Sequence, residues 1–310
     1  MSIARYAIVT AAKNEAAFIE KTLQTVLRQT VMPQKWVIVS DGSTDCTDEI
    51  VTRYADQFEF IRLLRRESND RQFGSKIKAV QAGVEALGDI GYEFLGILDA
   101  DIELPPDYYE TLLGHFESDP EVGLLGGTRK DLLGDVFVPI RFNELSIGGA
   151  YQLFRRSCYE DIGGFLTLKF GGADMMAGVA ARQRGWKVRA LAELEALHLK
   201  PTGSAEGSYL LRGISRGKRN CMMGYHPVFE ILKLLRVRSG NDVLHNVGEV
   251  FGFVSQWFSR EEYQVPSEVV AFLRQEQLGR IRHLMTRFRD PACGRNERTS
   301  QINESAGASP

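Results

Sequence analysis

Two aspartates separated by one residue follow a short apolar run: Phe94 to Leu98 is followed by Asp99, Ala100 and Asp101. An apolar run of this length predicts a strand that is buried on both faces. Because residues two apart on a strand share a face, both carboxylates can point into one crevice at the strand's end. Crowded carboxylates repel unless a cation lies between them, and oxygen ligands favour Mg²⁺ or Mn²⁺. The pattern therefore indicates a metal and diphosphate site, or two acids that simply end a strand.

The first third of the chain alternates strand and helix patterns. Strands are predicted over residues 6–10, 36–39, 58–64 and 94–98, and helices from Asn14, from Asp45 as N-cap, and over residues 75–87. Such alternation with short turns predicts a parallel sheet covered by helices on both faces. Sheets of this kind bind ligands beyond the C-terminal ends of their strands, which is where Asp99 and Asp101 lie.

The rest of the chain is less regular. We predict strands over residues 122–126, 151–155 and 186–191, a helix over 174–184, and a mobile loop over 130–149. After Pro227 the pattern is helical, and the polar tail over 291–310 is predicted to be disordered. The expected organisation is a main domain over residues 1–225, a helical extension over 226–290, and the tail.

The composition of the 310 residues is that of an ordinary soluble protein, with 44% hydrophobic residues, 25% charged residues and a formal net charge of −2. A near-neutral chain of this kind is not expected to bind nucleic acid. Its four cysteines lie far apart, a spacing that fits neither a zinc site nor a disulfide framework and suits a reducing compartment. The N-terminus leaves no room for a signal peptide, and no apolar run approaches the roughly 18 residues of a membrane span. We therefore expect a cytoplasmic protein.

Several segments, taken in order, resemble the family 2 glycosyltransferases of the GT-A fold. They are residues 9–15, 39–45, 75–83, the Asp99-Ala100-Asp101 run, 151–156 with 162–165, and 171–174 followed by Arg182 and 185–188. The resemblance covers about residues 3–200. It implies an α/β GT-A fold, with a mostly parallel sheet flanked by helices and a helical C-terminal extension. Residues 1–225 would be the catalytic domain, with a nucleotide-binding half over 1–115 and an acceptor half over 116–225.

The resemblance implies a metal-dependent, inverting transferase. It would move a single sugar from a nucleotide-diphosphate donor, a UDP-sugar, to an acceptor hydroxyl. The acceptor would be a saccharide or a lipid-linked saccharide in bacterial polysaccharide or glycolipid assembly. The Gln-x-x-Arg-Trp motif of processive synthases is absent from the sequence, so we expect one sugar to be added per encounter.

The resemblance also implies roles for individual residues. Those expected to bind the nucleotide sugar are Thr10, Glu15, Asp41, Lys76 and Asp99. Asp101, with Asp99, is expected to hold Mg²⁺ or Mn²⁺ and so to stabilise the departing nucleoside diphosphate. His198 could supply a further metal ligand or could be a hydrogen-bonded structural histidine. Glu15 and Lys76 could equally serve only their own helices, as a charge near the helix N-terminus and a solvated side chain.

Asp174 is the candidate general base. An acceptor hydroxyl must lose its proton as it attacks the anomeric carbon, and a carboxylate within hydrogen-bond reach can accept that proton. Many relatives have a Glu-Asp pair here, whereas this chain has Ala173-Asp174, which leaves a single acid for the role. The alternative is that Asp174 caps the helix that follows it.

Two other functions remain open. A nucleotidyltransferase that makes sugar nucleotides shares the sheet and the metal carboxylates, and a catalytically silent protein could bind a sugar nucleotide without turnover. An NAD-dependent oxidoreductase is excluded because no Gly-x-Gly-x-x-Gly follows the first strand. The aromatic segment 247–258 could pack on the core, form a homodimer contact, or bind peripherally at the inner face of a membrane.

Overall fold

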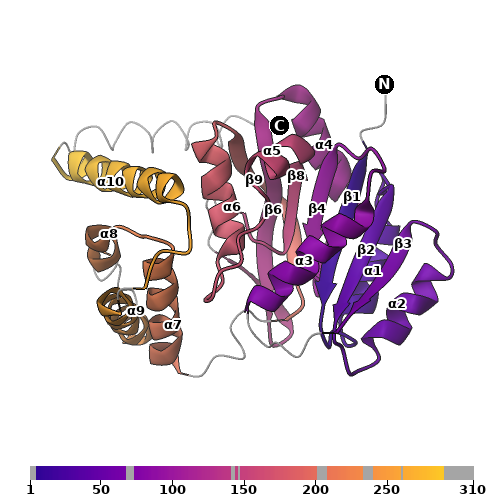
Figure 1. Ribbon diagram of the computed structural model, residues 1–310, viewed down its shortest axis with the longest axis horizontal. Helices are drawn as coiled ribbons and strands as arrows, with labels where there is room; N and C mark the ends of the chain where they lie inside the picture. The colour runs from indigo at the N-terminus through magenta and orange to yellow at the C-terminus, as the bar shows by residue number, and fades with distance from the viewer. Residues whose placement is uncertain are drawn as a thin grey trace, which may run out of the picture. The chain divides into compact units, whose positions relative to one another are not determined.

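The computed structural model describes residues 5–67, 73–140, 144–145, 147–200, 208–232, 240–259 and 261–289 (Figure 1). The chain forms two compact units that divide between Arg212 and Gly213. This division lies within helix α7 (Tyr209–Met222), whereas the sequence placed the boundary after residue 225. The tail over 291–310, which the sequence predicts to be disordered, lies outside the described residues. We call the first unit, which contains most of the expected catalytic domain, the catalytic unit and the second the helical unit.

The first half of the catalytic unit is a parallel sheet. Its strands are β1 (Tyr6–Ala12), β2 (Lys35–Asp41), β3 (Ile61–Arg66) and β4 (Phe94–Leu98), in the order β3-β2-β1-β4. The intervening helices are α1 (Ile19–Leu27), α2 (Thr47–Ala55) and α3 (Phe73–Leu87). Because crossovers are right-handed, α1 and α2 lie on one face and α3 lies on the other, across β1 and β2 (Figure 1). The strand order reverses between β1 and β4, which makes a crevice at this edge.

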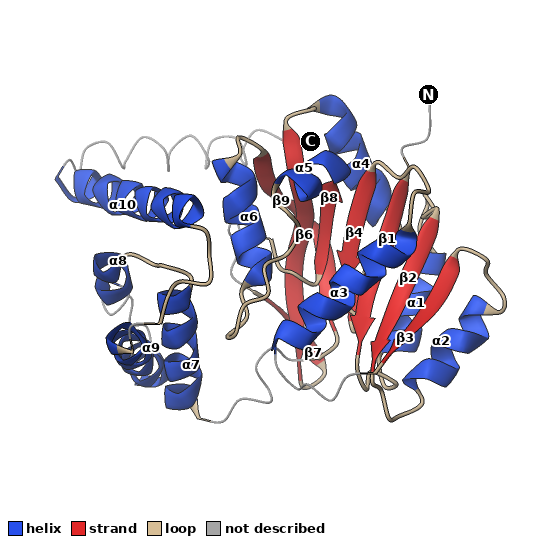
Figure 2. Cartoon of the chain, viewed as in Figure 1, coloured by secondary structure: helices blue, strands red, loops and turns tan. Residues whose placement is uncertain are grey.

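The second half of the catalytic unit extends this sheet in a mixed way (Figure 2). Its elements are β5 (Ile102–Glu103), α4 (Tyr108–Ser118), β6 (Val122–Leu133), β7 (Val136–Pro139), β8 (Tyr151–Arg155), α5 (Arg156–Asp161), α6 (Ala173–Gln183) and β9 (Lys187–His198). Strand β8 is antiparallel to both β4 and β6, β9 is parallel to β6, and β5 is antiparallel to β9. The expected parallel sheet thus describes the first half, and antiparallel pairs dominate the second.

A hairpin occupies part of the segment that the sequence predicted to be a loop. Strand β6 continues to Leu133, turns at Gly134 with φ +62°, and returns as β7 to Pro139. The prediction of an irregular segment over 130–149 was therefore wrong for this stretch. The side chains of the hairpin are mostly polar or exposed, so they lack the apolar alternation that indicates a strand in sequence.

Helix α1 fixes the chain that follows β4. Thr22 Oγ1 donates a hydrogen bond to the carbonyl oxygen of Ala100 at 2.9 Å, and Thr25 Oγ1 donates to that of Leu104 at 2.9 Å. Both threonine side chains are buried. Since an unpaired buried carbonyl is costly, these bonds hold the backbone around Asp99 and Asp101 in one position.

The helical unit contains the rest of α7 with α8 (Pro227–Leu232), α9 (Gly240–Phe258) and α10 (Ser267–Arg289). Helices α7 and α9 approach closely because their contact is made by glycine. A Cβ atom at Gly217 would overlap the carbonyl oxygen of Glu249, and one at Gly252 would overlap that of Ile214. No helix within the described ranges has the length and apolar content needed to cross a bilayer.

Candidate functional site

The loops that follow β1 and β2 are bonded to each other. Asn14 has the left-handed φ of +56°, and its Oδ1 accepts a hydrogen bond from Thr44 N at 2.8 Å. Asp45 accepts from Ala16 N at 3.1 Å and from Thr47 N at 3.0 Å. It thus bonds the start of α2, although the N-cap residue is Cys46 rather than the predicted Asp45. Asparagine tolerates the left-handed conformation better than most residues, and here its side chain links the two loops.

Thr10 lies below this edge rather than on it. Its side chain is completely buried, and its Oγ1 accepts a hydrogen bond from Trp36 Nε1 at 2.9 Å. The expectation that its side chain contacts a base or ribose was wrong, because that hydroxyl is enclosed in the core between β1 and β2.

Asp41 stands at the end of β2, where the sequence expected a base-binding carboxylate. It is only 3% exposed, and its Oδ1 accepts a hydrogen bond from Arg66 Nη1 at 2.8 Å. Its Oδ2 accepts a short hydrogen bond from Ser75 Oγ. A ligand N–H would share this carboxylate with Arg66, which lies opposite it in the register of β2 and β3.

Lys76 and Asp99 form an ion pair across the crevice. Lys76 Nζ lies 2.7 Å from Asp99 Oδ2, and the lysine side chain is 47% exposed. Burial raises the pKa of Asp99 above its ordinary value, and the charge of Asp101 adds to this rise, although Lys76 opposes it. Burial acts to lower the pKa of Lys76, but neighbouring carboxylates outweigh it and raise that pKa. These carboxylates are those of Asp99, Asp174 and Asp101.

His198 lies between two carboxylates at the end of β9. Its Nε2 is 3.4 Å from Asp101 Oδ2, and its Nδ1 is 3.2 Å from Asp131 Oδ1. Asp131 in turn contacts Arg129 Nε at 2.8 Å. Burial acts to raise the pKa of Asp101, but the hydrogen bond from His198 and nearby positive charges bring it below its usual value. Asp101 is therefore ionised over the whole physiological range of pH.

The strand register explains this contact. His198 pairs with Ile102 of β5 on one side and with Asp131 of β6 on the other. Residues that are paired across two strands point to the same face of the sheet. The pairing with Asp131 therefore puts these two side chains on one face of the sheet, and the pairing with Ile102 brings His198 beside the turn that contains Asp101.

Glu15 closes the crevice on the side of β1. Its Oε1 lies 3.0 Å from Lys200 Nζ. Burial raises the pKa of Glu15 above its ordinary value, although the hydrogen bond from Lys200 opposes the rise. The charges of Asp101 and Asp99 raise it further.

Asp174 is positioned by a backbone amide rather than used as a helix cap. Its Oδ2 accepts a hydrogen bond from Gly149 N at 3.0 Å. The N-cap of α6 is Gly172, and no side chain bonds the start of that helix. A Cβ atom at residue 149 would lie 2.6 Å from Asp174 Cβ, so the glycine makes room for the carboxylate. The alternative that Asp174 caps the helix was therefore wrong.

The donor atoms around Asp101 suit a hard divalent ion that is also bound by a diphosphate. Among the described residues, no group of three or more His, Cys, Asp or Glu side chains could hold a metal by itself. Asp101 and His198 nevertheless offer a carboxylate and an imidazole side by side. Mg²⁺ and Mn²⁺ sites in enzymes commonly combine one or two protein ligands with substrate phosphates. The contact of His198 Nδ1 with Asp131 leaves Nε2 directed toward Asp101, as in metal sites with a carboxylate behind the histidine.

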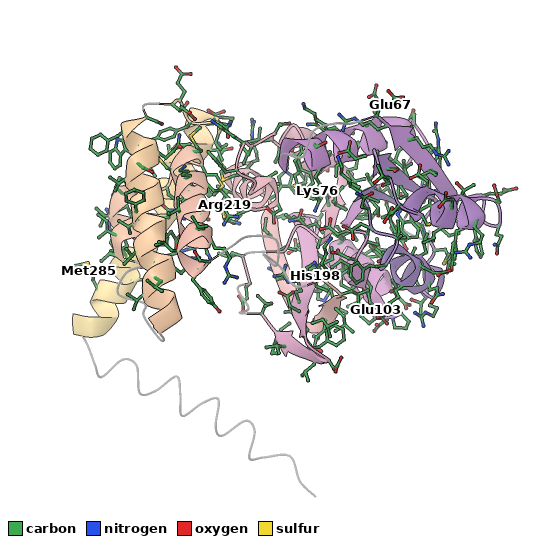
Figure 3. All side chains as sticks on the ribbon, turned by 90° about the horizontal axis from the view of Figure 1, so that it is seen from below. Glu67, Lys76, Glu103, His198, Arg219 and Met285 are labelled. Atoms are coloured by element: carbon green, nitrogen blue, oxygen red, sulfur yellow. The ribbon has the colours of Figure 1, made fainter. Side chains whose placement is uncertain are left out.

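Figure 3 labels Lys76 on α3 and His198 at the end of β9, two of the side chains that frame the crevice. Charged groups from segments after β1, β4 and β9 and from α3 and α6 thus meet at one edge of the sheet. A model of the family described as glycosyl transferase family 2 matches residues 7–165.

The chain belongs to this family.

This glycosyltransferase also resembles individual curated proteins. Poly-beta-1,6-N-acetyl-D-glucosamine synthase of Staphylococcus aureus (strain COL) is 25% identical over an alignment 170 residues long, and the match covers 48% of this chain and 39% of that protein. The synthase of the same name from Staphylococcus epidermidis is 25% identical over 169 residues, with the same coverage. The match therefore spans less than half the length of these relatives.

Solved structures share the fold of this glycosyltransferase. The mannosyltransferase PcManGT from Pyrobaculum calidifontis, in complex with GDP-Man and Mn²⁺, has a TM-score of 0.53 at 19% identity, covering 82% of this chain and 73% of that chain. TarS 1–349 of S. aureus, in complex with UDP-GlcNAc, has a TM-score of 0.53 at 14% identity, covering 83% and 73%. At these identities the likeness establishes the GT-A fold alone.

Several residues of the site were not predicted from the sequence of this glycosyltransferase. They are Arg66, Arg129, Asp131, Gly149 and Lys200. All except Arg129 contact a predicted residue from a different segment of the chain, and Arg129 contacts Asp131 on its own strand. The signal that could have found them is strand register, since Asp131 and His198 pair directly.

Proposed function

We propose that this glycosyltransferase moves a single sugar from a nucleotide-diphosphate donor, a UDP-sugar, to an acceptor hydroxyl with inversion. One observation carries the proposal. Three carboxylates from separate segments, those of Asp99, Asp101 and Asp174, act on the single ammonium group of Lys76 at the edge where the strand order reverses. A site that gathers acids in this way suits a ligand with a diphosphate, a leaving group and an incoming hydroxyl.

The donor occupies the edge formed by β1, β2 and β4. Asp41 accepts a hydrogen bond from the base, sharing its carboxylate with Arg66. Glu15 and Lys76 border the ribose and diphosphate, and Asp99 binds the ribose or the donor sugar while it orients Lys76. The bonded loops after β1 and β2 keep these groups in place before binding, which lowers the entropy lost on complex formation.

Asp101 and His198 are the residues that would hold Mg²⁺ or Mn²⁺. When bound, the ion would neutralise charge that builds on the departing diphosphate. Asp131 and Arg129 act behind His198: Asp131 faces its Nδ1 and Arg129 holds Asp131. These two residues keep the imidazole turned toward Asp101.

Asp174 accepts the proton of the acceptor hydroxyl. The bond from Gly149 N fixes one carboxylate oxygen, and the charge of the group acts on Lys76. Proton transfer to a positioned carboxylate as the hydroxyl attacks the anomeric carbon gives a single displacement and hence inversion.

The names of the relatives support the choice of donor and pathway. A poly-N-acetylglucosamine synthase and a TarS complex with UDP-GlcNAc favour a UDP-sugar and polysaccharide assembly. The complex of PcManGT with GDP-Man and Mn²⁺ makes GDP-mannose the second donor to test and Mn²⁺ the first metal.

A panel of sugar nucleotides tests the proposal. The purified chain is incubated with each donor and Mn²⁺ or Mg²⁺, and release of nucleoside diphosphate is measured. We expect release from one UDP-sugar, and its loss in Asp101→Ala. Stabilisation by a donor without release would instead identify a silent binding protein. Release of pyrophosphate from a nucleoside triphosphate and a sugar phosphate would identify a nucleotidyltransferase.

A further inference from the structure

Helix α9 presents an apolar stripe to solvent. Its exposed residues are Val243, Leu244, Val247, Phe251, Val254, Trp257 and Phe258, with exposed fractions between 40% and 82%. Positions 244, 247, 251, 254 and 258 follow alternating steps of three and four, so they lie along one side of the helix. A contiguous exposed stripe of this kind indicates an interaction surface.

The opposite side of α9 is the one that faces the helical unit. Apart from Phe253, which is 4% exposed, its buried residues are small or polar. Gly252 lies against the α7 backbone. Glu249 is 4% exposed and accepts a hydrogen bond from Asn220 Nδ2 at 2.7 Å, and Gln256 is 8% exposed. In a helix of a soluble core the apolar side faces inward. Here the polar side is the one held by the neighbouring helices, so the apolar side is left for a partner.

Charge favours an anionic partner. Helix α7 contains four basic residues and no acidic residue: Arg212, Arg216, Lys218 and Arg219. From Gly213 to the C-terminus the sequence has 14 Lys and Arg against 10 Asp and Glu, a net charge of +4. The preceding residues 1–212 have 24 against 30, a net charge of −6. The only charged side chain described on α9 besides His245 is that of Glu249, which is buried.

The stripe suits a bilayer better than a second copy of the helix. In a helical dimer the positions beside such a stripe usually contain charged residues that select the partner. On α9 these positions are occupied by Gly248, Val250, Ser255 and Trp257. Aromatic residues that carry a polar group, such as the indole N–H of Trp257, are instead typical of the membrane interface.

We propose that α9 binds flat to the surface of an anionic lipid bilayer, with Phe251, Val254 and Phe258 among the acyl chains and the net positive charge of the helical unit favouring anionic lipid. Basic residues contribute to such binding in proportion to the anionic lipid present. One part of this proposal rests on the proposed function: the acceptor of the transferred sugar is a lipid-linked saccharide at that surface.

Vesicle binding of the full-length chain tests the proposal without any donor. Co-sedimentation is measured with phosphatidylcholine vesicles and with vesicles that also contain roughly 30% phosphatidylglycerol. We expect binding to the anionic vesicles and much weaker binding to the neutral ones. The double variant Phe251→Ser with Phe258→Ser should weaken binding at least about tenfold, since each ring loses its burial in lipid. The matched control, Val136→Ser with Val138→Ser on the exposed β7 hairpin of the catalytic unit, should leave binding unchanged.

Trp257 reports on the same event in the unmodified chain. The other two tryptophans are Trp36, which is buried, and Trp186, which donates a hydrogen bond to Asp161. Brominated acyl chains should quench Trp257, and Trp257→Phe should remove the quenching while vesicle binding persists. The proposal is overturned if anionic vesicles neither bind nor quench the wild-type chain, or if the double serine variant binds as wild type. A dimer that ignores vesicles and dissociates in the double variant would also overturn it, in favour of a second copy. Failure of the donor panel would leave the vesicle result unaffected, so the two proposals fail separately.

Discussion

In the catalytic unit, β1, β2 and β4 bury almost every apolar side chain, and charged groups gather at the exposed edge. The helical unit differs in how much apolar surface it leaves exposed. Of the large apolar side chains that are exposed in the described part of the chain, twelve belong to the helical unit and eight to the larger catalytic unit. Both units also bury polar side chains, which in the helical unit are Asn220, Glu230, Glu249, Gln256 and Gln277.

The difference shows how the two units are stabilised. The catalytic unit draws its stability from apolar burial, which is independent of orientation and tolerates a strained, charged edge. The helical unit also buries apolar side chains, and glycine contacts between α7 and α9 with the buried hydrogen bonds of Asn220 fix one arrangement of its helices. Burial of its exposed apolar surface by a partner would contribute further favourable free energy. Four changes test this contrast, from the largest expected effect to the smallest.

Asp174→Asn should abolish catalysis and nothing else. Loss of the general base is expected to lower the rate of sugar transfer by about 10²–10⁴-fold. Vesicle binding and melting temperature should stay at wild-type values, since Asn can still accept the bond from Gly149. The measurement is the rate of nucleoside diphosphate release with acceptor present. Near-normal transfer would remove Asp174 from the role of base.

Asp131→Leu should weaken metal binding. Without an acceptor behind His198 Nδ1 the imidazole loses its orientation, and we expect about 10–100-fold weaker binding of Mn²⁺ in the presence of nucleoside diphosphate. Electron paramagnetic resonance of Mn²⁺ measures this directly. Asp131→Asn keeps an oxygen acceptor, so its affinity for Mn²⁺ should fall less. Glu195→Gln changes only the exposed ion pair with Lys130 and should leave the affinity for Mn²⁺ unchanged. Wild-type affinity in the leucine variant would contradict the assignment.

Gly217→Val should loosen the helical unit alone. The added side chain must displace the α9 backbone at Glu249, and overpacking of this kind costs about 1–3 kcal/mol. Hydrogen exchange should quicken in α7 and α9, with no change in β1, β2 and β4. Ser215→Val on the exposed side of the same helix is the matched control. Equal effects of the two variants would show that the glycine contact does not set the packing.

Glu15→Gln should slightly stabilise the protein at neutral pH. Burial raises the pKa of Glu15, so between its ordinary and raised values the folded chain holds more protons than the unfolded chain. The free energy of unfolding therefore falls as the pH rises through this window, and glutamine removes that loss. We expect a melting temperature higher by about 2 °C or less at pH 7, and no difference below about pH 4. A lower melting temperature at pH 7 would show that the Lys200 pair outweighs the burial.

The sequence predicted the parts of the site that depend on local pattern. Asp99 and Asp101 follow a buried strand as expected, and Asp174 opens a helix one residue from its predicted start. Thr10 was misplaced because the burial of its hydroxyl depends on Trp36 in the next strand. The partners Asp131 and Lys200 were missed because their contacts arise from pairings between distant segments, which a single sequence does not reveal.

The fold, like the site, was predictable where local sequence patterns are strong and not where contacts between distant segments decide. The strands and helices up to β4 have strong apolar periodicity, and their order was predictable from right-handed crossovers. The β6–β7 hairpin was not predictable, because apolar and polar residues do not alternate regularly along its two strands. For α9 the sequence showed an aromatic helix but left open which side faces inward, because a run that contains both glycine and aromatic residues does not say which of them packs on its neighbours.

The two-residue strand β5 sets the order in which the site is completed during synthesis. The donor edge needs only the strands up to β4, which leave the ribosome early. His198 reaches Asp101 only after β9 has paired with β5 and β6. Because a slip of one residue would turn the imidazole to the opposite face of the sheet, this brief pairing also decides whether it arrives correctly. A nascent chain can therefore have the edge of β1, β2 and β4 in place well before Asp101, Asp131 and His198 lie together.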